Sequence, residues 1–173
     1  MDIKDKVQEE MKRAEMQAAN MLAIKFNMPI ENVSIRNMRP TDLEVYTAGS
    51  GSTSKTMGEN TMVVDAGTTE NTLSTEVPNS EYYVLEGLYL PKVTGVYTDY
   101  VAFYIGDNKE RWYRGAMIES EPNSTMYFDD PFVVKGGDRV RVRFLTTSDG
   151  NGTGVRSQYH PIMILGKVLK AQG

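Results

Sequence analysis

The sequence predicts a mainly β protein, an antiparallel β-sandwich or a jelly-roll-like barrel with a long N-terminal amphipathic α-helix. Three observations indicate this fold. From residue 82 onward, segments rich in Val, Ile, Tyr, Phe and Thr alternate with turns rich in Gly, Asn and Asp. No helical period interrupts them, which favours antiparallel strands. In residues 1–26, by contrast, apolar residues recur every three or four positions, which is the period of a helix.

The N-terminal helix is expected within residues 1–28, as an arm for assembly or packing. Asp2 suits the N-cap, and Pro29 ends the segment. Its apolar stripe is the predicted assembly interface, and its members are Ile3, Val7, Met11, Ala14, Ala18, Met21 and Leu22. Two packings remain open, because the stripe can cover the protein's own sheet or dock on a neighbouring subunit. Four methionines in residues 1–26 favour the second packing, since methionine adapts to imperfect partners.

Residues 29–81 are expected to hold short strands and a flexible arm. The stretches "ENVSIRNM" and "DLEVY" are strand candidates, and "TMVVDAG" is a third candidate inside the arm. In residues 47–61, eleven of fifteen residues are Ser, Thr, Gly or Asn. Such a stretch buries too little apolar surface to offset the entropy lost on ordering it.

Residues 82–173 are predicted to form the β-sandwich domain. The core candidates are Tyr83, Leu85, Val101, Phe103, Ile105, Trp112, Phe132, Val140, Val142, Phe144, Ile162 and Ile164. In "KGGDRVRVRF" the apolar residues alternate with Arg139, Arg141 and Arg143, so the arginines are expected on the outer face of a half-buried strand. Carboxylates of the same chain are their favoured partners, and a subunit or polyanion contact is the alternative.

The residues offer little support for catalysis or for a cofactor. The chain has no cysteine and one histidine, His160, so a thiolate metal site is excluded and a histidine-based relay lacks a second histidine. Asp149, Asn151 and Thr153 resemble the first half of a calcium loop, but its twelfth position is His160 and not the required Glu. We therefore expect a non-enzymatic protein with no cofactor and no resident metal.

No apolar run approaches the about 20 residues that span a bilayer, and the charged N-terminus does not read as a secretory signal, so we expect no membrane contact. The net charge is −4, although residues 135–173 carry seven basic and two acidic side chains. This overall balance makes a nucleic-acid partner unfavoured. A small-molecule ligand is not expected either.

The combination of the N-terminal helix with "VLEGLYLPKVTG" and "PFVVKGGDRVRVRF" resembles small structural proteins of virus particles. These are the jelly-roll-like coat, decoration or neck components of phages and archaeal viruses. The resemblance is architectural and implies self-assembly into a homo-oligomer, contacts with other particle subunits, and a place in a virion made in the host cytoplasm. One alternative is a carbohydrate- or ligand-binding, adhesin-like module that uses Tyr97, Tyr100, Trp112 and Tyr113. A further alternative is an accessory nucleic-acid-binding module.

Overall fold

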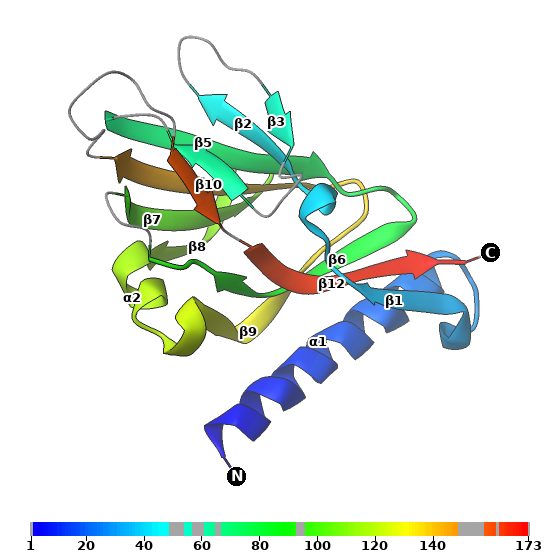
Figure 1. Cartoon of the computed structure of the whole chain (residues 1–173). Helices are drawn as coiled ribbons and strands as arrows, with labels where there is room; N and C mark the ends of the chain where they lie inside the picture. Colours follow the sequence, from blue (N-terminus) through cyan, green and yellow to red (C-terminus); the bar gives the residue numbers. More distant parts are fainter. Residues whose placement is uncertain are drawn as a thin grey trace.

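The computed structural model describes residues 2–48, 54–56, 61–64, 67–92, 96–148, 158–161 and 163–172. Two antiparallel sheets lie one above the other, and one long helix runs across the far side of the smaller sheet (Figure 1). The predicted class, mainly antiparallel β with a long N-terminal helix, is confirmed. The helices are α1 (Ile3–Lys25) and the short α2 (Gly115–Glu119).

Sheet A contains four strands in the spatial order β1 (Val33–Asn37), β12 (Met163–Ala171), β6 (Glu81–Tyr89) and β9 (Thr125–Val134). Sheet B contains six, in the order β3 (Ser54–Thr56), β2 (Glu44–Ala48), β5 (Gly67–Glu76), β10 (Arg139–Ser148), β7 (Val96–Ile105) and β8 (Asn108–Arg114). A separate pair joins β11 (Gln158–Pro161) to β4 (Thr61–Val64). Both large sheets draw strands from residues 29–81, so the sheets begin before residue 82.

Eight of these strands pair in a nested pattern. The outermost in chain order, β1 and β12, pair with each other, and inside them β5 pairs with β10. Further inward β6 pairs with β9, and the innermost strands, β7 and β8, form a hairpin around Gly106, whose φ is 61°. Two further pairings, β12 with β6 and β10 with β7, join these pairs into the two sheets. In these eight strands each outer pair therefore encloses the next, down to the β7–β8 hairpin.

The main core lies between the two sheets. Sheet A contributes Tyr83, Leu85 and Phe128, and sheet B contributes Phe103 and Phe144. Along β10, Val140, Val142 and Phe144 are fully buried, as the alternation predicts. Trp112 was predicted in the core, and this prediction is wrong, because its side chain is 45% exposed on the outer face of the edge strand β8. Ile162 lies outside the described residues.

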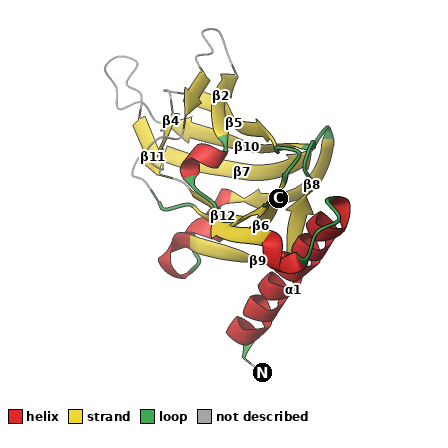
Figure 2. Ribbon diagram, turned by 90° about the vertical axis from the view of Figure 1, so that its right-hand side faces the viewer, coloured by secondary structure: helices red, strands yellow, loops and turns green. Residues whose placement is uncertain are grey.

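A second, smaller core lies between sheet A and α1. The helix contributes Ala14, Ala18, Ala19 and Leu22, which pack against Tyr82, Val84 and Leu169 of the sheet. Strand β6 is buried on both of its faces, because Tyr83 and Leu85 point into the main core while Tyr82 and Val84 point towards α1. Three alanines bring the helix close to the sheet, and Figure 2 shows it running obliquely beside the strands of sheet A.

Other predicted elements differ from the structure for local reasons. Strand β5, with the sequence "GTTENTLSTE", was not predicted because Leu73 is its one large apolar residue. The stretches "STMYFD" and "PFVV" form one strand, β9, whose pairing with β6 is irregular between Tyr127 and Phe132. Pro131 is tolerated because β9 is an edge strand, where a missing N–H costs no ladder hydrogen bond. The end of "ERWYRGAMIES" forms α2 and not more strand.

Replacing Leu22 tests the packing of α1 on its own sheet. Leu22→Ala removes a fully buried side chain from the second core and should lower the free energy of unfolding by about 2–5 kcal/mol. The measurement is chemical denaturation followed by circular dichroism. Gln17→Ala, at an exposed position of the same helix, is the control and should change stability by less than about 0.5 kcal/mol. Equal effects of the two changes would contradict this packing.

Candidate functional site

Exposed apolar side chains gather on the face of sheet A that carries α1, and we call this the α1 face. Within the part of the chain that the structure describes, nine large hydrophobic side chains are exposed. Six of them belong to the α1 face, as members of α1, its C-cap or the strands beside it: Ile3, Met16, Ile24, Phe26, Ile35 and Tyr127. The other three, Tyr97, Trp112 and Met117, lie on β7, β8 and α2. Six exposed apolar side chains on one side of the molecule make this side the candidate interaction surface.

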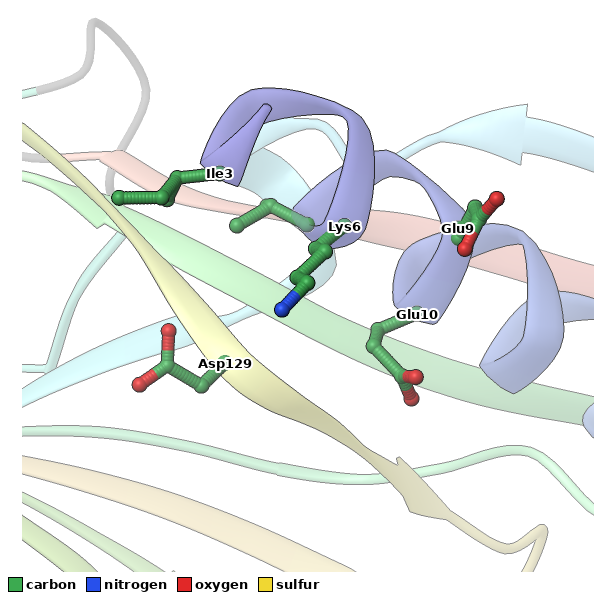
Figure 3. Close-up of a pocket in the computed structure, with 6 residues that line it drawn as sticks. Ile3, Lys6, Glu9, Glu10 and Asp129 are labelled. Carbon is green, nitrogen blue, oxygen red and sulfur yellow. The ribbon is translucent and has the colours of Figure 1, made fainter. Parts of the chain in front are cut away.

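The two halves of α1 pack differently. In the C-terminal half, Ala18, Ala19 and Leu22 are almost completely buried, whereas Ile3 in the first turn is 78% exposed. A cavity of about 440 Å³ separates the first three turns from β9, and Figure 3 shows Ile3, Lys6, Glu10 and Asp129 around it. In Figures 1 and 2 these turns project beyond the strands. The N-terminal half of α1 is therefore less tightly packed than the C-terminal half: Val7 and Met11 are half-buried, and Ile3 is exposed.

The predicted assembly stripe is divided between these two environments. Ala14, Ala18 and Leu22 are buried against sheet A of their own chain. Met21 is half-buried beside the same core. Val7 and Met11 are half-buried and line a cavity of about 230 Å³ together with Tyr127 of β9. Only the N-terminal end of the stripe therefore remains exposed for contacts with other subunits. The exposed face of α1 also carries Met16 and Ile24, which were not part of the predicted stripe.

A buried carboxyl group lies beneath α1. Glu86 of β6 is 1% exposed, and its Oε1 accepts a hydrogen bond from Lys167 Nζ of β12 at 3.2 Å. The same ammonium lies 3.6 Å from Glu15 Oε1 of α1, so one lysine serves two carboxyl groups. The second oxygen of Glu86, Oε2, has no hydrogen-bond partner. A cavity of about 190 Å³, lined in part by Glu86, Lys167 and Met11, adjoins this cluster.

The surroundings of Glu86 favour its neutral form. Burial comes first and the neighbouring Glu15 second, and against the opposing effect of Lys167 they raise the pKa of Glu86 to about 7. Sequence reasoning missed this cluster. Its signal was a single carboxylate inside the apolar run "YYVLEGLY", a position at which an unpaired charge is costly.

The arginines of β10 lie on the outer face of sheet B. Arg139 lies 3.7 Å from Glu76 and Arg141 lies 2.6 Å from Asp107, so both have the favoured partners, carboxylates of the same chain. Arg141 and Arg143 also flank the ring of Tyr104, at 5.9 and 5.4 Å from its centroid. Exposed ion pairs of this kind contribute little to stability, about 0–1 kcal/mol each.

Three of the four aromatic residues considered for ligand binding share this outer face. Tyr100 and Trp112 stack with their ring centroids 6.1 Å apart, and Arg114 lies over the ring of Trp112. Tyr97, on the same strand as Tyr100, is 58% exposed. Tyr113 points the other way, because it packs on Phe103 and Phe128 in the main core. Tyr97, Tyr100 and Trp112 therefore form an aromatic patch on β7 and β8.

The remaining candidates fall outside the site. Asp149, Asn151 and Thr153 lie outside the described residues, and so do most of residues 47–61. His160 belongs to β11. In the described ranges no group of three or more His, Cys, Asp or Glu side chains is placed to hold a metal ion. Likewise, no helix among the described residues is long and apolar enough to cross a membrane.

No family model matches the sequence, and no curated protein matches it.

Proposed function

We propose that the protein is a non-enzymatic structural subunit that assembles with copies of itself through the α1 face. The observation that carries this proposal is the concentration of exposed Ile, Met, Phe and Tyr side chains on α1 and beside it. These side chains remain exposed although the C-terminal half of the helix is tightly packed on sheet A. A second copy of the chain offers a surface of the same chemistry, as a two-fold symmetric contact requires.

The fold is compatible with a component of a larger particle, and a virion coat, decoration or neck protein is the setting we propose. The nested pairing of eight strands supports a jelly-roll topology, because a jelly roll is a pair of Greek keys formed by rolling up a hairpin of this kind. Jelly rolls occur in viral capsid proteins, but also in lectins and cupins. The topology therefore supports the setting, while the assembly proposal rests on the α1 face.

The size of the contact can be estimated from the helix. A helix of 23 residues is about 35 Å long and about 10 Å wide, which corresponds to roughly 350 Å² of facing surface. A stable protein–protein contact buries about 800 Å² on each partner. Helix α1 alone falls short of this area, so the flanking residues Phe26, Ile35 and Tyr127 are expected to take part.

Charges introduced on the exposed face of α1 test the assembly. The variant Ile3→Glu/Met16→Glu/Ile24→Glu alters three exposed side chains, so it should fold normally but run as a single chain in size-exclusion chromatography with light scattering. The wild-type protein should form a larger species at the same high concentration. Deleting residues 1–28 is a poorer test, because it would uncover Tyr82, Val84 and Leu169 of sheet A.

Met117→Glu is the matched control, because Met117 on α2 is as exposed as Met16 (55% against 57%) but lies outside the α1 face. This control should assemble like the wild type. A wild-type protein that stays monomeric at every concentration would overturn the proposal, and so would a triple variant that assembles as well as the wild type.

A second candidate function is a carbohydrate-binding module, favoured by the aromatic patch of Tyr97, Tyr100 and Trp112. Exposed aromatic rings give sugars a surface to stack on, and Arg114 supplies a hydrogen-bond donor beside Trp112. If the protein has this function, it should give a signal on a glycan array. Trp112→Ala should lower the affinity at least about tenfold, which corresponds to a loss of about 1.4 kcal/mol of binding free energy. Tyr127→Ala, at a similarly exposed tyrosine on β9, should leave the signal unchanged. An empty array excludes this candidate for the glycans tested.

A further inference from the structure

We propose that Glu15, Glu86 and Lys167 form a proton-operated latch between α1 and sheet A. The latch holds the N-terminal half of the helix on the sheet in acidic solution and loosens it as the pH rises to neutrality. This proposal concerns the docking of α1 and does not require that the protein assembles. Its consequence for assembly rests on the proposed function.

The geometry of the cluster explains why a proton matters. Three elements meet there, because Glu86 comes from β6, Lys167 from β12 and Glu15 from α1. With both carboxyl groups ionised, two negative charges share one ammonium, and the buried Oε2 of Glu86 has no donor. With Glu86 protonated, one carboxylate faces one ammonium. The neutral form therefore fits the docked helix better.

Among the described residues, the charged groups that act on Glu86 are Glu15 and Lys167, so no second positive charge balances the two carboxylates. On the neighbouring strand β9, the pairing with β6 is irregular between Tyr127 and Phe132, and this stretch contains Asp129 and Asp130. Both aspartates are exposed to solvent and are negative, so they cannot supply the missing positive charge. On the other side, β1 places the uncharged Asn37 opposite Lys167. The second carboxyl group of the cluster, Glu15, belongs to the helix, so moving α1 away separates it from Glu86.

The direction of the effect follows from the docked state. With the helix docked, the pKa of Glu86 is about 7. The ordinary value of 4.5 applies once the helix has moved away and water reaches the carboxyl group. A carboxyl group whose pKa is raised in the docked state makes its full contribution to docking when the pH is below its pKa in the undocked state. That stabilisation is lost as the pH rises from about 4.5 to about 7, and it stays lost at higher pH.

The position of the cluster along α1 determines which part of the helix responds. Glu15 lies between the tightly packed Ala18–Leu22 turn and the first three turns. Cavities of about 440, 230 and 190 Å³ lie along those first turns, so they pack less tightly on the sheet than the Ala18–Leu22 turn does. Release therefore frees the end of α1 that carries Ile3 and Val7, while Leu22 keeps the rest docked. In the assembling protein this end is the segment that reaches a neighbour.

The test is hydrogen exchange of the backbone amides of α1 at pH 5 to 8, corrected for the intrinsic pH dependence of exchange. The protein is the Ile3→Glu/Met16→Glu/Ile24→Glu variant, so that assembly does not contribute. Opening of residues 6–15 should increase at least about tenfold from pH 5 to 7, the equivalent of one pKa unit, and then level off. Residues 18–25 should show a much smaller change.

Three substitutions identify the group responsible. Glu86→Gln cannot ionise, so it should remove the pH dependence, and Glu9→Gln, which removes an exposed carboxylate from the same helix, should retain it. Lys167→Met removes the positive charge that stabilises ionised Glu86, so the pH dependence should become larger and extend above pH 7. The same pH dependence in the parent and in both Glu86→Gln and Lys167→Met would overturn the latch. A monomeric wild-type protein would overturn the assembly proposal and leave the latch intact.

Discussion

The rest of this structure depends on one strand that is apolar on both faces. In β6, Tyr83 and Leu85 fill the core between the sheets, and Tyr82 and Val84 point the opposite way. A sheet with two apolar faces needs a second cover, because exposing rings and branched side chains to water costs about 25 cal/mol per Å². Helix α1 supplies that cover through a short stretch of alanines and one leucine. The helix is thus an integral layer of the fold and not an appended arm.

This constraint also explains why the two halves of α1 pack differently on the sheet. Only the C-terminal half lies over the apolar part of β6, so the N-terminal half extends past it with cavities beneath and Ile3 in solvent. At the boundary, β6 carries Glu86 and α1 carries Glu15, with Lys167 as their shared counter-ion. A tight apolar contact and a charged, proton-dependent contact therefore follow each other along one helix. The first fixes the helix to the fold, and in our proposal the second controls the part that reaches a neighbouring copy.

Much of the β framework could be predicted from the sequence, because half-buried strands carry an alternating pattern. The clearest case is β10, where Val140, Val142 and Phe144 are buried and the arginines lie outside. Strand β5 could not be predicted, because its position in the sheet comes from pairing with β10 and β2 and not from its own apolar residues. The run "YYVLEGLY" carried the signal for a doubly buried strand. The sequence could not predict that α1 covers this strand, since the helical period does not show whether a helix packs on its own sheet or on a neighbouring subunit.

The most direct test of the central claim, that copies of the chain bury the α1 face, is the rate of thiol alkylation. The chain has no cysteine, so Met16→Cys and Met117→Cys each introduce a single reactive thiol. As the concentration is raised and the protein assembles, alkylation of Met16→Cys should slow markedly while that of Met117→Cys keeps its rate. If both thiols react equally fast in the dilute and the assembled protein, or if only Met117→Cys is protected, then copies meet elsewhere and the account is contradicted.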